Sequence, residues 1–251
     1  MKIEFHYTYL IIALSFILTG YFSNLLVFTS IIIIHELGHY LIAKLNHLKV
    51  EKIIIYPYGG ITKMNNPINT KISVDLLVAI SGVLFQTIYY LLIFFLYKQG
   101  IIRQYIFNQF TTYHQSILIF NLLPIHPLDG SKIFTLILSI YLPYKLTLKI
   151  NIIISIITLI TIISINYYQF NYTTILIITI ILDSIFKYYK EINYLFNKFL
   201  LERYLHKTKY QKTKKISKID HMYKEKYHLI KENNTYITEK QALKHRFLRK
   251  Y

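Results

Sequence analysis

The sequence predicts an all-α polytopic membrane protein with about six transmembrane helices, a short β-hairpin and a basic cytosolic tail. Hydrophobic residues make up 54% of the 251 residues, and they gather in long runs. Basic residues gather instead at the C-terminal end. Residues 187–251 hold 18 of the 29 Lys and Arg but only 6 of the 12 Asp and Glu, so they carry +12 of the net charge of +17. An apolar body with a basic end is typical of a membrane protein whose charged end is cytosolic.

Six stretches are long and apolar enough to be considered as membrane spans. A bilayer has a hydrocarbon core ~30 Å thick, which takes about 20 mostly apolar helical residues to cross. The stretches are residues 7–22, 25–45, 74–97, 113–142, 146–166 and 172–189. The first follows Lys2 and resembles a signal peptide, but it lacks a small-x-small cleavage site. We therefore expect it to be retained as a span.

The distribution of basic residues between these stretches predicts the orientation. Lys44 at the end of the second stretch and four lysines in the loop after it make five, and Lys145 and Lys149 lie where the fourth stretch gives way to the fifth. The loops on the opposite side hold only Lys98 and Arg103. Loops rich in Lys and Arg stay in the cytosol. Six spans with both termini in the cytosol satisfy this rule at every loop.

Two segments depart from regular helix. Residues 51–64 contain a β-branched run followed by Pro57, Gly59 and Gly60, which is a hairpin pattern. Pro124 and Pro127 lie inside the fourth apolar stretch, where each costs a helix interior ~3 kcal/mol. A broken helix at membrane depth is tolerated where protein or a water-filled cavity surrounds it.

A metal-binding pattern lies in the second apolar stretch, as His35-Glu36-Leu37-Gly38-His39. Histidines four residues apart share one face of a helix, so both imidazoles can bind one zinc ion. The glutamate beside the first histidine can then act as a base toward water at the metal. The alternative, polar residues that only hold a helix interface together, does not require this trio. The pattern predicts a Zn²⁺ site with His35 and His39 as ligands and Glu36 as the catalytic residue.

Asp129 is the best candidate for a third zinc ligand. A catalytic zinc has three protein ligands and one open position, and an acidic residue in an apolar stretch is costly unless it has a function. The second and fourth stretches run in the same direction, and Asp129 lies at a depth similar to that of His35. The alternative is an N-cap of the second half of the broken helix, and both roles can coexist. Asn121 is predicted to contact the substrate, with a hydrogen bond between helices as an equal alternative.

The absence of cysteine narrows the chemistry further. Disulfides, thiol catalysis and zinc sites with cysteine ligands are all excluded. Two alternatives to an enzyme remain. One is a catalytically silent membrane scaffold that binds client transmembrane segments, which has no need for Glu36. The other is a metal transporter, which predicts acidic residues and histidines through several spans, whereas the last two stretches offer mainly Ser, Thr and Asn.

These motifs resemble those of the site-2 protease family of intramembrane zinc metalloproteases. HELGH at residues 35–39 is followed by FNLLPIHPLDG at residues 120–130, which fits the Asn/Pro-x-Asp-Gly signature of that family. Within the family, the chain is similar to the stage IV sporulation protein FB branch. This likeness covers roughly residues 1–205 and runs through three more segments, which are YPYGGIT (56–62), AISGVLFQ (79–86) and FLLERY (199–204).

The resemblance implies a zinc enzyme of a bacterial cell membrane that cuts a membrane-associated protein near or within the bilayer. In this branch the substrate is a membrane-bound pro-sigma factor of sporulation, and membrane proteins inhibit or regulate the enzyme. The resemblance also implies that residues 53–62 form a membrane-dipping hairpin beside the site. Such a strand can extend a substrate by β-addition. Tyr58, Gly59 and Gly60 on this hairpin are therefore expected to bind substrate.

The C-terminal end departs from that branch, which usually ends in a nucleotide-sensing CBS domain. Residues 205–251 are too few for a complete copy of it. We expect residues 1–190 to form the transmembrane domain and residues 191–251 a basic cytosolic tail, either a truncated CBS-like remnant or a mostly helical extension. The charge of the tail favours contact with anionic lipid or an acidic partner. No nucleic acid partner is expected, because no binding motif accompanies the charge.

Overall fold

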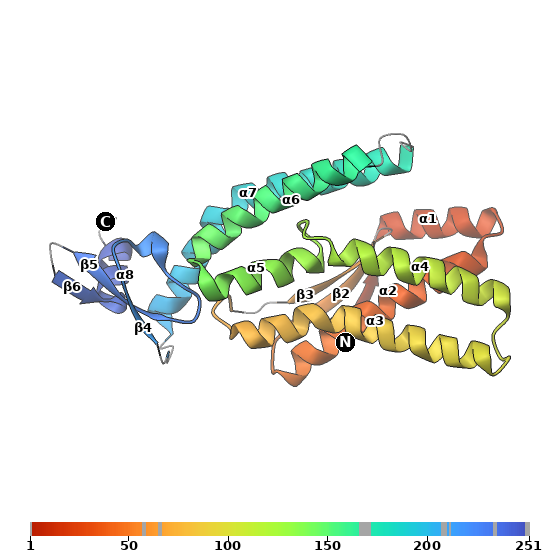
Figure 1. The fold of residues 1–251 in the computed structure, drawn as a ribbon, viewed down its shortest axis with the longest axis horizontal. Coiled ribbons are helices and arrows are strands. Elements are labelled where there is room, and N and C mark those ends of the chain that lie inside the picture. The colour runs from red at the N-terminus through yellow and green to blue at the C-terminus, as the bar shows by residue number, and fades with distance from the viewer. Residues whose placement is uncertain are drawn as a thin grey trace. The chain divides into compact units, whose positions relative to one another are not determined.

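The structure is a computed structural model, and its described residues divide into two compact units. The described residues are 2–56, 59–64, 67–165, 172–206, 210, 212–232 and 235–248. The first unit comprises Met1–Asn66 and Leu76–Leu122, and the second comprises Pro67–Asp75 and Leu123–Tyr251. Helices make up most of both units, and each unit also contains a three-stranded sheet (Figure 1).

Four helices build the first unit. They are α1 (Tyr7–Leu18), α2 (Phe22–Leu45), α3 (Ile72–Lys98) and α4 (Gln104–Leu122). The turn from α1 to α2 is made at Gly20, whose φ of 79° is accessible to glycine without steric cost. This turn ends α1 earlier than the predicted stretch, after 12 residues. At 1.5 Å per residue, α1 is ~18 Å long, which is shorter than the hydrocarbon core of a bilayer.

The sheet of the first unit contains the predicted hairpin. β2 (Val50–Tyr56) and β3 (Gly59–Met64) pair antiparallel, which confirms the hairpin predicted for residues 51–64. Its tip, at residues 57–58, lies outside the described residues. β1 (Ile3–Phe5) pairs parallel with β2 and was not predicted, because three residues are too few to show a strand pattern. Ile53 and Ile55 of β2 are buried in one cluster with residues of α1 and α2.

The fourth predicted stretch is broken, as its prolines indicated. α4 ends at Leu122, and α5 (Asp129–Tyr141) begins only after a non-helical segment that holds both prolines. The helix is longer than the apolar stretch at its start, because α4 begins at Gln104 and the stretch at residue 113. Phe107 stacks on Tyr97 of α3, with ring centroids 4.3 Å apart, which stabilises this first part of α4. The amides among its first residues hid the apolar pattern.

The second unit contains the longest helix. α5 is followed by α6 (Tyr144–Ile165) and α7 (Tyr172–Leu205), and α6 and α7 pack side by side (Figure 1). α7 continues well past residue 189, where the predicted sixth span ends. With 34 residues it is ~51 Å long, so a span of ~30 Å takes up only part of it. The FLLERY segment is therefore the end of this helix.

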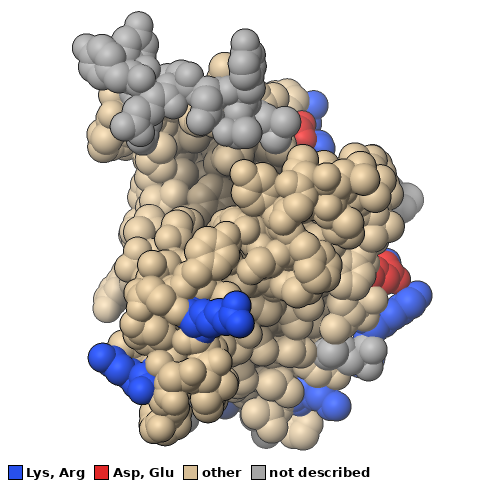
Figure 2. Space-filling model, turned by 90° about the vertical axis from the view of Figure 1, so that its right-hand side faces the viewer, with Lys and Arg blue, Asp and Glu red and all other residues tan. Residues whose placement is uncertain are grey.

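Three helices among the described residues are long and apolar enough to cross a membrane, namely α2, α3 and α6. Large apolar side chains are exposed along them, for example Leu91 of α3 and Ile157 of α6. Figure 2 shows a face of the molecule on which charged side chains are sparse. Exposed apolar surface of this extent is typical of a protein that contacts lipid. The count of six spans and the cytosolic side of the termini stay predictions.

The tail folds into a small sheet covered by a helix. β4 (Thr213–Ile216) pairs parallel with β5 (Tyr227–Glu232), and β5 pairs antiparallel with β6 (Thr235–Thr238). A short 3₁₀ helix, η2 (Ile219–His221), follows β4, and α8 (Glu239–Leu248) follows β6. The expectation of a mostly helical extension was therefore wrong. Short strands rich in lysine show little apolar alternation in the sequence. Whether the tail is a CBS-like remnant stays a prediction.

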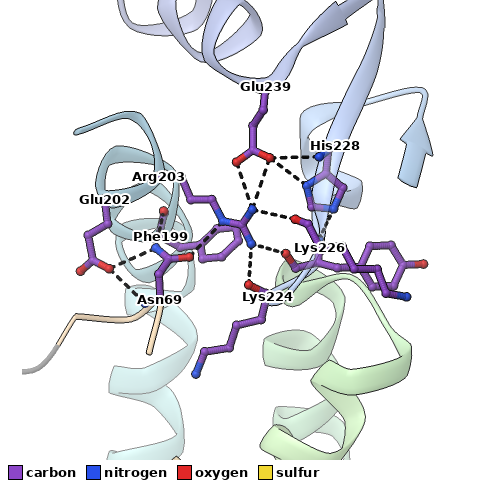
Figure 3. A network of polar contacts seen from close by, with 9 residues as sticks. Asn69, Phe199, Glu202, Arg203, Lys224, Lys226, His228 and Glu239 are labelled. Carbon is purple, nitrogen blue, oxygen red and sulfur yellow. Dashed lines mark hydrogen bonds and ion pairs between the residues drawn. The ribbon is translucent and has the colours of Figure 1, made fainter. Parts of the chain in front are cut away.

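Arg203, in the last turn of α7, holds this small sheet within the second unit (Figure 3). Its guanidinium donates to the carboxylate of Glu239 at 3.1 Å and to the backbone oxygens of Tyr223, Lys224 and Lys226. Its Nε donates to Asn69 Oδ1 at 3.0 Å. The side chain of Arg203 is fully buried. A buried charge with this many partners joins α7, the tail and the segment before α3.

Candidate metal centre

His35, Glu36 and His39 lie together on α2, as predicted. Their possible ligand atoms all lie within 4.8 Å of one another. The three side chains are buried, with 3%, 4% and 5% of their surface exposed. The single turn of helix between the two histidines puts both imidazoles on one face. The first unit therefore contains a compact and water-poor cluster of metal-binding groups.

Hydrogen bonds on the far side of each imidazole fix how the two rings are oriented. His39 Nδ1 lies 2.7 Å from the backbone oxygen of Val78, and His35 Nδ1 lies 3.0 Å from Oε1 of Gln86. Both of these oxygens only accept, so each Nδ1 carries the hydrogen. Neither Nε2 then carries the hydrogen, and the two Nε2 atoms face each other. Metal-binding histidines in proteins commonly make this kind of outer hydrogen bond.

The two Nε2 atoms lie at a separation that suits zinc. They are 3.2 Å apart. Two nitrogens that each lie at a tetrahedral Zn–N distance of about 2.0–2.1 Å are separated by ~3.3 Å. Gly82 of α3 leaves the room beside them, because a Cβ there would be 2.6 Å from His35 Nε2 and still closer to His39 Nε2. The residues present therefore fit a zinc ion.

The hairpin strand β3 lies beside the carboxylate of Glu36, as the resemblance implied. The hydroxyl of Thr62 donates to Glu36 Oε2 at 2.6 Å. A Cβ on Gly60 would lie 2.7 Å from Glu36 Oε1, which is closer than real Cβ contacts. Glycine at this position lets the strand run directly against the glutamate. The carboxylate is thus held in place beside the two imidazoles.

Asp129 belongs to the second unit, where it is the first residue of α5. It is buried, and one carboxylate oxygen lies 2.8 Å from Nζ of Lys132. Leu128 occupies the N-cap position and makes no side-chain capping bond, so the N-cap alternative for Asp129 was wrong. The helix begins one residue earlier than that alternative required. The role of Asp129 as a zinc ligand stays a prediction.

The predicted substrate-binding residues have different places in the structure. Asn121 is half-buried at the end of α4. Gly59 and Gly60 begin β3, and Gly60 contacts Glu36 as described above. Tyr58 lies outside the described residues. Their contact with substrate stays a prediction.

Sequence reasoning assigned no role to four groups that support the site, namely the carbonyl of Val78 and the residues Thr62, Gly82 and Gln86. Two of them had a visible signal, because a glycine and a glutamine four residues apart in an apolar helix share one face. The other two had none. A backbone carbonyl has no signature in the sequence, and a single threonine in a strand is common.

The region that contains this site matches a known protein family. The sequence model of Peptidase family M50 matches residues 23–117, which include both histidines and Glu36. Stage IV sporulation protein FB of Bacillus subtilis is 31% identical over 213 residues, which are 83% of this chain and 73% of that protein. A zinc metalloprotease of Methanocaldococcus jannaschii is 28% identical over 167 residues, which are 60% of this chain and 46% of that protein.

A solved structure has a similar fold. The site-2 protease from Methanocaldococcus jannaschii superposes with a TM-score of 0.59 and 22% sequence identity. The match covers 74% of this chain and 91% of that protein. It supports the mainly helical arrangement with its few strands.

Proposed function

Because the chain belongs to the site-2 protease family of intramembrane zinc metalloproteases, Peptidase family M50, we propose that it hydrolyses a peptide bond of a membrane-associated protein at the cluster of His35, Glu36 and His39. The observation that carries the proposal is the convergence of two Nε2 atoms, 3.2 Å apart, beside a buried glutamate. Outer hydrogen bonds orient both rings for this convergence. The chain is an integral membrane zinc metalloprotease, and the residue roles below are our assignment.

His35 and His39 are the zinc ligands in this proposal, and Asp129 is the third. A zinc ion held in this way lowers the pKa of a water molecule toward ~7 and polarises a carbonyl group. The open fourth position required by such chemistry is compatible with three protein ligands. Gly82 supports the assignment, because no larger residue would leave room next to the two Nε2 atoms.

Glu36 acts as the general base and general acid. It takes a proton from the attacking water and returns it to the amine of the departing peptide. The hydrogen bond from Thr62 to Oε2 holds the carboxylate while it carries out both transfers. Because Glu36 is buried, bulk water does not compete for the proton at each step.

β3 presents the substrate. It is an edge strand of its sheet, and Gly60 near its start lies against Glu36. An extended peptide that pairs with such an edge has an exposed scissile amide, whereas in a helix the same amide is shielded by its own turn. Tyr58, Gly59 and Gly60 are the proposed substrate contacts, and Gly59 and Gly60 begin this strand. Asn121 is proposed to bind a substrate carbonyl.

A pro-sigma factor of sporulation is the proposed substrate, and membrane proteins are the proposed inhibitors or regulators. The similarity to stage IV sporulation protein FB over most of both chains supports this choice. The proposed topology has six spans in a bacterial cell membrane, with both termini and the basic tail in the cytosol. That side of the membrane is where a sigma factor is released.

A co-expression assay tests the function. Tagged membrane-tethered candidates, including a sigma-factor pro-sequence, are expressed with wild type or with Glu36→Gln. Wild type is expected to give a shortened product, and Glu36→Gln is expected to lower its rate by at least ~100-fold because the proton-transfer group is lost. Immunoblotting of the tag measures the product.

Two outcomes would contradict the proposal. An equal amount of product with both proteins would mean that a host protease does the cutting. A wild type that binds each candidate but cleaves none of them, with its membrane partners also co-expressed, would favour a scaffold that retains client segments.

A further inference from the structure

A buried glutamine of α3 lies behind the first histidine of the metal centre. The side chain of Gln86 is fully buried, with 0% exposed, and burial of an amide is costly unless both of its ends are hydrogen-bonded. Its two ends contact two different helices, α2 and α4. We propose that Gln86 is a positioning residue that fixes the tautomer and the orientation of His35. This inference rests on the proposed function, since it concerns the same zinc site.

The backbone of α4 determines which way the amide points. Gln86 Nε2 lies 3.0 Å from the backbone oxygen of His114 and 3.3 Å from its Nδ1. A backbone oxygen only accepts, so the NH₂ end of the amide must face α4 and Oε1 must face His35. The reversed amide would place two acceptor oxygens against each other in a buried position. The orientation is thus set by a carbonyl that no side-chain substitution removes.

The fixed amide in turn fixes the proton on His35. Because Oε1 accepts, the hydrogen of the imidazole resides on Nδ1, and Nε2 has the lone pair that a metal requires. The backbone carbonyl of Val78 fixes the hydrogen of the His39 imidazole on Nδ1 in the same way. The two ligands therefore differ in their support, since one is anchored by backbone and the other by a side chain. Only the anchor of His35 can be removed by mutation.

The side chain of His114 adds a second contact between α4 and Gln86. Its ring is buried and stacks on Tyr90 of α3, with centroids 4.4 Å apart and an angle of 10° between the planes. The stacked ring presents Nδ1 to the second hydrogen of the Gln86 amide. Gln86 is therefore held from α4 by two acceptors and holds α2 by one. Loss of Nδ1 alone leaves the stronger backbone acceptor in place.

A role limited to helix packing is the competing explanation. Gln109 provides the matched control, because its half-buried amide also joins two helices of the first unit. Its Nε2 donates to Asn24 Oδ1 at 2.8 Å, which links α4 to α2. It takes no part in the metal centre. A packing role predicts similar effects for both glutamines, whereas a positioning role predicts an effect on the metal from Gln86 only.

The test compares full-length wild type, Gln86→Leu, Gln109→Leu, His114→Phe and His35→Ala, purified in detergent. Zinc affinity is measured by competition with a chelator, and the visible spectrum of bound Co²⁺ reports the geometry of its ligands. Gln86→Leu is expected to weaken zinc binding by about 10–100-fold and to shift the Co²⁺ bands, since outer partners of ligands have effects of this size. His114→Phe is expected to have a smaller effect, and Gln109→Leu is expected to match wild type.

The controls separate this inference from the function on which it rests. If His35→Ala binds zinc as wild type does, the proposed metal centre is wrong. If His35→Ala loses zinc but Gln86→Leu keeps wild-type affinity and spectrum, the metal centre stands and the role of Gln86 is wrong. Equal losses of zinc affinity in Gln86→Leu and Gln109→Leu would also overturn the positioning role of Gln86, because helix packing would then explain both losses.

A measurement on wild type covers the case in which Gln86→Leu does not fold. Nitrogen NMR shifts of the His35 ring, identified by their loss in His35→Ala, are recorded on the metal-free protein. A proton on Nδ1 is expected. A proton on Nε2 would overturn the proposal, because Gln86 would then not be accepting from that ring.

Discussion

Two buried histidine clusters in this protein share one hydrogen-bonding feature, at Nδ1, and differ at Nε2. In the tail, His228 donates from Nδ1 to Glu239 at 3.2 Å and accepts at Nε2 from the backbone N–H of Tyr223 at 3.0 Å. Both ring nitrogens are thus used within the protein, so this cluster is structural. In α2, the Nδ1 atoms of His35 and His39 are anchored in the same manner, but their Nε2 atoms point at one another. Burial is therefore common to the structural histidine and to the two proposed metal ligands, whereas the direction of the second nitrogen differs between them.

The charged groups of the two clusters differ in the same way. Glu239 is surrounded by donors, because it accepts from Arg203, from His228 and from the backbone N–H of His228. Glu36 accepts a hydrogen bond from Thr62 and is packed closely against Gly60, so among the described residues its carboxylate has fewer donors around it than that of Glu239. A carboxylate held by many donors stabilises a fold, whereas one with few donors keeps acceptor capacity for water or substrate. Each of the following predictions tests one side of this contrast.

Replacement of Arg203 is expected to have the largest effect on stability. In Arg203→Met the carboxylate of Glu239 stays buried without its guanidinium, and loss of one partner of a buried ion pair costs about 3–5 kcal/mol. Hydrogen exchange of residues 213–248 measures the loss. Arg246→Met is the control, since its ion pair with Asp220 is 3.9 Å long and partly exposed. If both variants lose hydrogen-exchange protection to a similar degree, the special role of Arg203 is wrong. If Arg203→Met also loses bound zinc, the tail cluster is not purely structural.

Replacement of Thr62 is expected to affect turnover with little effect on stability. Thr62→Val keeps the shape of the side chain but removes the hydroxyl that donates to Glu36. A hydrogen bond to a charged group contributes about 1.5–3 kcal/mol, so kcat is expected to fall by about 10–100-fold. Thr62→Ser retains the hydroxyl and is expected to restore most of the rate. The idea fails if the valine variant cleaves as fast as the serine variant in the same assay.

The smallest expected effect is a dependence of tail stability on pH. Burial lowers the pKa of His228 below its ordinary value of 6.5, and the hydrogen bond to Glu239 only partly opposes this. Between the lowered pKa and 6.5 the unfolded chain binds more protons than the folded one, so stability is complete above 6.5 and decreases as the pH falls through the folded pKa.

Hydrogen exchange of the tail at about pH 7.5 and about pH 5.5 measures this decrease. His228→Gln removes the titrating ring, so the difference in protection between the two pH values should shrink in this variant. An unchanged difference would assign the dependence to another group.

The sequence predicted that His35 and His39 lie together because the signal is local. Two histidines four residues apart on one helix meet whatever the rest of the fold does, since the helix alone sets their separation. The prolines likewise predicted the break between α4 and α5, because a missing N–H interrupts a helix in any context. The hairpin at residues 51–64 was predicted from its own turn residues. Asp129 and Asn121 are separated from the histidines by long stretches of chain, so their roles stay predictions.

Features that depend on partners distant in sequence were missed or misjudged. β1 is three residues long and exists because β2 offers it an edge. The early start of α4 depends on aromatic contacts with α3. The strands of the tail were not predicted, because a buried arginine from the end of α7 organises them.

By itself, the sequence determined the membrane class and the zinc metalloprotease family, and it predicted the reacting residues, because each follows from residue types within one element. Only the tertiary structure decided how those residues are supported. It set the tautomers of His35 and His39 through Gln86 and the Val78 carbonyl, and it placed Gly60, Thr62 and Gly82 around them. The physical reason is that a hydrogen bond or a close contact between elements depends on their relative position, and residue order along one element does not contain that position.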